Sequence, residues 1–203
     1  VKSTKQFIED TKEQKLSLLI SILLLIIAII FDYLSGTYTS NISSVPINDL
    51  ILDHIPLINL KTTFIYGYIL IISLFFAYPL VFKTKHLSYS ITQFSLLVSI
   101  RSFFIILTHL KDPAEAIMVK FPLIISNIAF TNDLFFSGHV AISFLGFLIF
   151  DKKSIKYFFL ISSLILSLSV LFMHLHYSID VFAAYFITYG SYKIGNRIYN
   201  KNE

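Results

Sequence analysis

The sequence predicts an all-α, polytopic membrane protein: a bundle of six transmembrane helices. Of its 203 residues, 56% are hydrophobic and only 14% are charged, whereas ordinary globular chains carry about 25% charged residues. Most of the apolar stretches are close to the roughly 20 residues that cross a bilayer. The basic residues behind the net charge of +4 flank those stretches, as topology determinants do, so we expect no nucleic-acid partner. The absence of cysteine excludes disulfide, zinc-thiolate and iron–sulfur sites.

The apolar segments divide the chain into six expected spans within one domain. The first four spans are expected at 16–33, 62–82, 87–110 and 135–150. The fifth is expected to end near His174, and the sixth is expected at 178–192. Residues 16–33 follow a basic region, as a signal peptide would, but the stretch is long and no small-x-small cleavage site follows it. The fourth span is short unless its start is buried in protein. We expect a cytoplasmic amino-terminal segment at 1–15, a catalytic membrane domain at 16–192 and a cytoplasmic tail at 193–203.

The loop charges predict the orientation of these spans. On the amino-terminal side lie Lys2, Lys5, Lys12, Lys15, Lys83, Lys85, Lys152, Lys153, Lys156, Lys193, Arg197 and Lys201. The other side carries only Lys61, Lys111 and Lys120. The positive-inside rule then places both termini in the cytoplasm. Five of the six histidines gather at the opposite, exoplasmic face, either periplasmic or lumenal, where we expect the active site.

Two histidines and an aspartate form the candidate catalytic set. His176 and Asp180 are four residues apart, so on a helix the carboxylate can bond one ring nitrogen and leave the other free. His139 arrives from another segment and supplies the acid–base partner that metal-free phosphoryl chemistry needs. Ser137 and Gly138 precede it at a helix amino terminus, which attracts phosphate. The structural alternatives are a helix-start histidine at an interface and a His–Asp pair at the membrane surface, but Asp180 lies inside a span, where ionisable residues are costly and usually functional.

Other polar residues leave more than one interpretation open. Arg101 lies within the third span and needs either a substrate phosphate or a structural partner such as Asp32 or Asp133. His174 either positions substrate or caps the fifth helix. Asp49 and Asp53, also four residues apart, are expected to form an ordinary solvated face.

Four blocks of the sequence resemble the sphingomyelin synthase family, in the PAP2-like C-terminal branch of the lipid phosphate phosphatase (PAP2) superfamily. Residues 46–54, Pro-Ile-Asn-Asp-Leu-Ile-Leu-Asp-His, are similar to a Pro-Leu-Pro-Asp…Asp-His loop. Residues 101–113 resemble an Arg…Thr-x-Leu-Pro block, and residues 133–139, Asp-Leu-Phe-Phe-Ser-Gly-His, match Asp-Tyr-Leu-Tyr-Ser-Gly-His. Residues 174–188 match His-Asp-His-Tyr-Thr-Val-Asp-Val-x3-Tyr-x-Ile-Thr. The chain resembles a short member of the family, which we expect to be bacterial.

The resemblance implies a phosphotransferase without cofactor or metal. His176, held by Asp180, would take a phosphocholine or phosphoethanolamine head group from a glycerophospholipid and pass it to ceramide or a similar lipid alcohol, with His139 as acid and then base. Substrate binding would fall to Arg101, Asp133, Ser137, Gly138, His174 and Tyr177. The superfamily's phosphatases carry an Arg six residues before the second catalytic His and a Lys-x6-Arg-Pro motif. Here that Arg position is Val170 and the motif is absent, which favours the synthase branch.

Two alternatives remain at the level of sequence. A hydrolase, either a phospholipase C or a lipid phosphatase, would use the same triad with water as acceptor. A non-catalytic channel or lipid-binding protein would need no His–Asp spacing. A homo-oligomer is compatible with either enzyme, and the expected partners are a phospholipid donor, a lipid-alcohol acceptor and membrane lipids.

Overall fold

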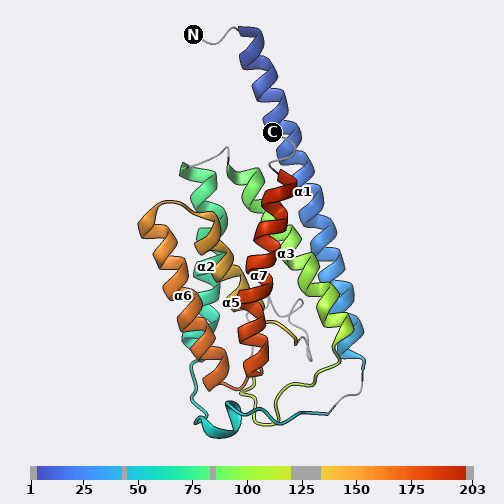
Figure 1. Cartoon of the computed structure of the whole chain (residues 1–203), viewed down its shortest axis with the longest axis vertical. Coiled ribbons are helices and arrows are strands. Elements are labelled where there is room, and N and C mark those ends of the chain that lie inside the picture. The colour runs from blue at the N-terminus through green and yellow to red at the C-terminus, as the bar shows by residue number, and fades with distance from the viewer. Residues whose placement is uncertain (1–3, 43–44, 83–85, 120–133, 200–203) are drawn as a thin grey trace.

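The computed structural model describes residues 4–42, 45–82, 86–119 and 134–199, with side chains from Gln14 onward. These residues contain α-helices, one 3-10 turn and no strand, which confirms the all-α prediction (Figure 1). The elements are α1 (Thr4–Ser40), η1 (Leu52–His54), α2 (Lys61–Phe82), α3 (Leu87–Leu107), α5 (Gly138–Ile149), α6 (Lys153–Phe172) and α7 (Ser178–Tyr199).

The helices are those of a membrane protein. In the described part of the chain, four helical stretches are long and apolar enough to cross a bilayer: Gln14–Ser40, Lys61–Phe82, Leu87–Leu107 and Lys153–Phe172. α5 has 12 residues, about 18 Å at 1.5 Å per residue, and the segment before it is already buried at Leu134, Phe136 and Ser137. α7 has 22 residues but is less apolar than α2, α3 and α6. The helical membrane fold is therefore confirmed, whereas six crossings remain a prediction.

α1 is longer than the predicted span at both ends. It begins at Thr4, within the predicted amino-terminal segment at 1–15, and continues to Ser40, past the predicted end at 33. Hydroxyl groups in its carboxyl-terminal turns are bonded within the helix: Ser35 Oγ donates to the Asp32 carbonyl at 2.9 Å and Thr39 Oγ1 to the Ser35 carbonyl at 3.2 Å. These bonds satisfy the hydroxyl groups but do not by themselves favour the helix.

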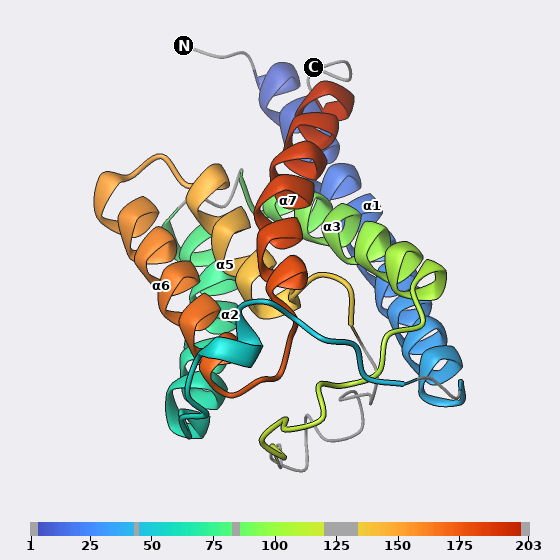
Figure 2. The same cartoon turned by 60° about the horizontal axis from the view of Figure 1, so that its bottom comes forward.

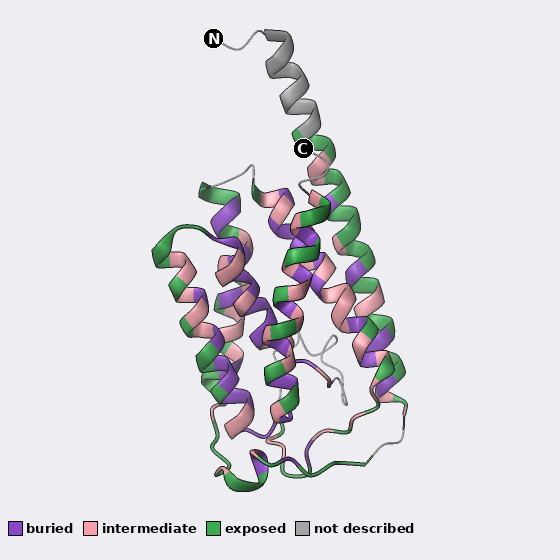
Figure 3. Ribbon diagram, in the orientation of Figure 1, coloured by how far each residue is buried: buried purple, intermediate pink, exposed green. Residues whose placement is uncertain are grey.

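α5 is the centre of the bundle and packs against α6, α7, α3 and α2. Figure 3 shows it as the most continuously buried helix, whereas α1 is exposed over much of its surface. The contact with α6 depends on Gly146, because a Cβ there would lie 2.2 Å from Cδ1 of the fully buried Phe159. α1 packs along α3 and not along α2. The bundle is therefore tight around α5 and loose between α1 and α2.

Two described loops cross the end of the bundle at which α6 turns into α7 (Figure 2). Both loops hydrogen-bond the last carbonyl groups of α6: Ile58 N–H donates to Phe172 O at 2.7 Å, and Ile117 N–H donates to Met173 O at 3.0 Å. Carbonyl groups at a helix end have no partner within the helix. The loops supply that partner and so cover the turn that carries the candidate histidines.

Candidate active site

His176 and Asp180 lie together at the start of α7, as the spacing predicts. His176 Nδ1 lies 3.2 Å from Asp180 Oδ2, and the same oxygen accepts the Tyr177 N–H at 3.0 Å. Tyr177 immediately precedes the helix, so Asp180 stands at its third position and reaches back to the amide of the capping residue, as the acidic member of a capping box does. One carboxylate thus stabilises the helix start and orients the imidazole. A donor at Nδ1 leaves the lone pair of His176 on Nε2.

The turn before His176 is held by the end of α6. Leu175 N–H donates to Val170 O at 2.9 Å and His174 N–H donates to Leu171 O at 2.9 Å, which is the bond pair of a Schellman motif. His174 occupies the left-handed position of that motif with φ of 53°, where glycine is usual. His174 thus caps α6 through its backbone, while a role of its imidazole in substrate binding stays a prediction; the buried side chain lies 3.9 Å from Glu115.

His139 occupies the first turn of α5, between aromatic side chains of α2. Its ring centroid lies 4.2 Å from that of Phe64 and 4.0 Å from that of Tyr68. Its Nε2 is buried and has no hydrogen-bond partner among the described residues. His139 is therefore held by ring stacking, whereas His176 is held by a carboxylate. Ring stacking suits His139 to a role as proton donor and acceptor, and the carboxylate suits His176 to a role as nucleophile.

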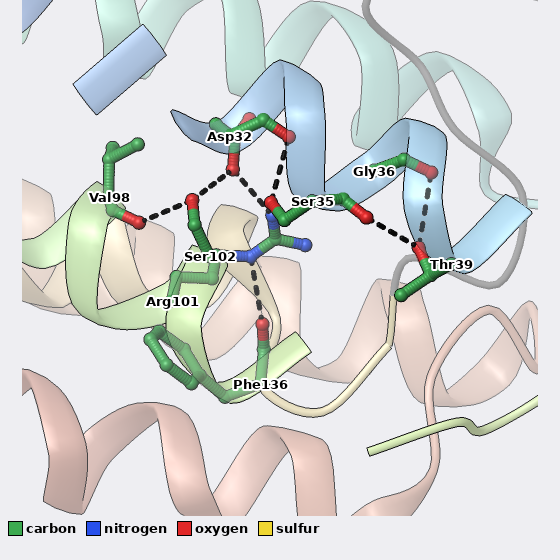
Figure 4. A network of polar contacts seen from close by, with 8 residues as sticks. All are labelled: Asp32, Ser35, Gly36, Thr39, Val98, Arg101, Ser102 and Phe136. Carbon is green, nitrogen blue, oxygen red and sulfur yellow. Dashed lines mark hydrogen bonds and ion pairs between the residues drawn. The ribbon is translucent and has the colours of Figure 1, made fainter. Parts of the chain in front are cut away.

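Arg101 is bonded to protein groups on two sides (Figure 4). Its Nε donates to the Phe136 carbonyl at 3.1 Å, and its Nη1 lies 3.5 Å from Asp32 Oδ1, which also accepts the Ser102 hydroxyl at 3.0 Å. Asp32 is one of the two structural partners that the sequence suggests for this arginine. The pairing satisfies a charge inside a span, while Arg101 still lines the cavity described below.

Ser137 joins the start of α5 to the start of α7, and the neighbouring Gly138 lies against Arg101. Ser137 N–H donates to the Asp180 carbonyl at 3.2 Å, so the segment before His139 is tied to the residue that holds His176. The Ser137 hydroxyl is buried without a partner in the described part of the chain. Gly138 faces Arg101, since a Cβ there would lie 3.2 Å from its Nε. The helix start, Arg101 and both histidines therefore converge, as an anion site requires.

A cavity of about 1000 Å³ connects this polar end with the apolar interior. Its polar lining residues are Asp32, Tyr33, Tyr68, Ser73, Arg101, Asp112, His139 and His176. Along α1, α2 and α3 it continues past Asp32, Tyr68 and Arg101 to Leu25, Phe76 and Phe94. Those intervals of seven or eight residues correspond to roughly 10–12 Å of helix. The cavity is thus amphiphilic, with its polar end at the histidines.

Of the predicted site residues, Arg101, Gly138, His139 and His176 line this cavity, whereas Ser137, His174, Tyr177 and Asp180 are described but do not line it. Tyr177 is buried, and its hydroxyl accepts the Ile47 N–H at 3.1 Å and donates to Lys111 O at 2.9 Å, so it joins two loops. Burial raises the pKa of this phenol, so it remains a donor at neutral pH. Asp133 lies outside the described residues. Within those residues no group of three His, Asp or Glu side chains could hold a metal ion.

The structure also corrects one expectation and adds residues. Asp49 is not part of a solvated face: it is buried and accepts bonds from Ile51, Leu52 and Ser178, whereas Asp53 is exposed as expected. The i, i+4 spacing could not separate the two, because burial of Asp49 depends on a helix start about 130 residues away in the chain. The sequence analysis did not single out Phe64 or Tyr68, and only the tertiary structure shows that their rings lie against His139.

A comparison with models of known protein families finds a match to one segment of this chain. Residues 131–196 match the family model described as PAP2 superfamily C-terminal. The match supports a place in the PAP2 superfamily. That superfamily consists of phosphatases and phosphotransferases, and the matched PAP2 segment contains His139, His174, His176 and Asp180. Searches of curated proteins and of solved structures find no match.

Proposed function

We propose that this protein is a membrane phosphotransferase that moves a phosphoalcohol head group from a glycerophospholipid to a lipid alcohol through a phosphohistidine on His176. The observation that carries the proposal is the amphiphilic cavity, which has the two histidines and Arg101 at its polar end. An aliphatic chain fits the apolar lining of α1, α2 and α3, and a phosphodiester fits the polar end. α1 and α2 both line the cavity and do not pack closely along each other, so the proposed route of substrate entry from the lipid phase lies between them.

In the first step, the Nε2 lone pair of His176 attacks phosphorus and the bond from phosphorus to the diacylglycerol oxygen breaks. His139 donates its proton to that oxygen, so diacylglycerol leaves as a neutral alcohol. The head group remains on His176 as a phosphoramidate. Asp180, bonded at Nδ1, compensates the positive charge that develops on the attacking ring. Arg101 and the amides at the start of α5 neutralise the phosphoryl oxygens.

In the second step, the hydroxyl of a lipid alcohol such as ceramide replaces diacylglycerol. His139 takes its proton while the oxygen attacks phosphorus, and the phosphorus–nitrogen bond breaks. His176 is returned with its lone pair, and His139 is again protonated for the next cycle. One group can serve as acid and then base because the second step is the chemical reverse of the first.

The charges around the cavity favour a phosphodiester over a phosphomonoester. Among the described residues that line it, Arg101 is the only Lys or Arg, and it lies beside Asp32. A monoester carries nearly two negative charges at neutral pH, for which this lining offers little compensation. A diester carries one, and an ammonium head group would reduce the net charge to zero. A phosphodiester hydrolase with water as acceptor is therefore the alternative to test first.

The test is incubation of the purified protein in vesicles with a phospholipid labelled in its head group, with and without ceramide. Labelled sphingolipid that forms only with ceramide supports the proposal. A labelled water-soluble head group in both samples would indicate the hydrolase instead. Failure of the folded wild-type protein to release label from any phospholipid would contradict both enzymes, and His176→Ala, which lacks the proposed nucleophile, is the negative control for release.

A further inference from the structure

The amino terminus of α7 receives a cap from a distant loop. The residue that precedes the helix is Tyr177, whose side chain is directed to Ile47 and Lys111 and not to the first amides of α7. Asp49 occupies that place: its Oδ2 accepts the Ser178 N–H at 2.7 Å and the Ser178 hydroxyl at 2.9 Å. A carboxylate at a helix amino terminus satisfies an unpaired amide and interacts favourably with the helix dipole.

The second oxygen of Asp49 is fully used within its own loop. Oδ1 accepts the amides of Ile51 and Leu52 at 2.9 and 3.1 Å, and the Asp49 carbonyl accepts the Asp53 N–H at 2.9 Å. Both oxygens of the side chain therefore face donors only. An asparagine has one acceptor oxygen and must direct its NH₂ at one of the two sets. The site therefore favours a carboxylate over an amide.

The loop that contains Asp49 also hydrogen-bonds α6, on the other side of the turn that carries His176. Ile58 N–H bonds Phe172 O at the end of α6, while Asp49 bonds Ser178 at the start of α7. His176 lies between these two attachments, within the 173–177 turn. Asp49 itself is absent from the residues that line the cavity. Its influence on the reaction would therefore pass through the position of α7 and not through the substrate.

We propose that Asp49 is a positioning residue: by capping α7 in trans it fixes the helix start from which Asp180 orients His176. This inference rests on the proposed function only for its kinetic consequence. A small displacement of a catalytic group, on the order of 1 Å, can reduce the rate about 100-fold. Loss of the cap would act on the chemical steps, and the cavity would still bind lipid.

The kinetic test compares Asp49→Asn with Asp53→Asn and Ser178→Ala. Asp49→Asn should lower kcat by about 10- to 100-fold and leave KM within about threefold. Asp53→Asn removes an exposed carboxylate of the same loop and should remain within about twofold of wild type. Ser178→Ala removes one of the two bonds to Oδ2 and should lower kcat a few-fold. A wild-type kcat in folded Asp49→Asn, or a loss confined to KM, would overturn the proposal.

A second readout separates this proposal from the proposed function. In ¹⁵N-histidine spectra of the protein in nanodiscs, His176 should be the Nδ1–H tautomer, with His176→Gln to assign the signal and Asp180→Asn as the positive control. Asp49→Asn should shift His176 toward a mixture of tautomers, whereas Asp53→Asn should not. This shift is measurable even if no lipid is turned over. If Asp49→Asn does not fold, Ser178→Ala decides, and wild-type kcat and an unchanged His176 signal in that variant would overturn the proposal.

Discussion

Gly138 faces the guanidinium of Arg101 so closely that a Cβ at residue 138 would lie 3.2 Å from Nε and 3.6 Å from Cζ. Arg101 cannot retreat freely, because Phe136 and Asp32 hold it from other directions. Gly138→Ala should therefore displace the guanidinium by a few tenths of an ångström and lower kcat about tenfold. Gly190→Ala is the matched control, since a Cβ there meets nothing within 4 Å. Equal activity of the two variants in a head-group release assay would contradict this role of Arg101.

The contact between α5 and α6 should tolerate no side chain at Gly146. A Cβ would lie 2.2–2.6 Å from the ring of Phe159, which is fully buried. Gly146→Ala should reduce the free energy of unfolding by about 1–3 kcal/mol, the usual cost of overpacking, seen as a lower melting temperature in detergent. The double variant Gly146→Ala/Phe159→Leu should recover part of the loss, and no recovery would mean that another contact limits the site.

The left-handed backbone at His174 predicts a difference between two truncations. His174→Gly and His174→Ala both remove the imidazole, but only glycine adopts a φ of 53° without strain. The glycine variant should be more stable by about 1 kcal/mol and retain more activity than the alanine variant. Thermal unfolding and turnover measured on both variants test this prediction. Equal and complete inactivity would instead assign the imidazole itself to substrate binding.

Acid should destabilise the protein through Asp49. Burial alone would raise the pKa of this carboxyl, but the bonds from Leu52, Ser178 and Ile51 outweigh burial and hold the pKa below its ordinary value of 3.8. A depressed folded-state pKa contributes stability above 3.8, and this is lost as the pH falls through the lower, folded-state value. Between pH 5 and 3, the melting temperature of wild type should fall more steeply than that of Asp49→Asn. Parallel curves would contradict the assignment.

The predicted orientation can be tested with single cysteines, because the protein has none of its own. Leu50 is 80% exposed on the loop at one end of the bundle, and Lys153 is exposed at the start of α6 at the other. In sealed vesicles of known orientation, an impermeant maleimide should label Leu50→Cys and Lys153→Cys from opposite sides, with Leu50→Cys reached from the exoplasmic side. Labelling of Leu50→Cys only from the cytoplasmic side would reverse the topology.

The sequence predicts those structural features that depend on residues close together in the chain. The apolar runs predict the helices to within a few residues at most ends, and the i, i+4 spacing of His176 and Asp180 predicts their contact. The third span ends at Leu107 and not at 110, because the chain becomes extended at Thr108 despite its apolar neighbours. α1 continues to Ser40 through a stretch of Ser, Thr and Gly whose composition suggests a loop.

The remainder could not be predicted because it depends on tertiary contacts. Nothing local distinguishes Phe64 and Tyr68, whose rings lie against His139, from aromatic residues in contact with lipid. The choice of Asp32 as the partner of Arg101 depends on how α1 packs along α3. Asp49 caps a helix 129 positions later in the chain, and no periodicity in the sequence carries that information.

The apolar portion of the cavity also determines the quantity on which the reaction rate should depend. A substrate that reaches His139 and His176 along α1 and α2 travels within the bilayer, so its supply is set by its mole fraction among the lipids and not by its molarity in the buffer. Adding inert phospholipid at constant total substrate should therefore slow turnover, whereas diluting the vesicles with buffer should leave the rate per protein unchanged. Under the proposed function, kinetic constants for this protein would be expressed in mole per cent.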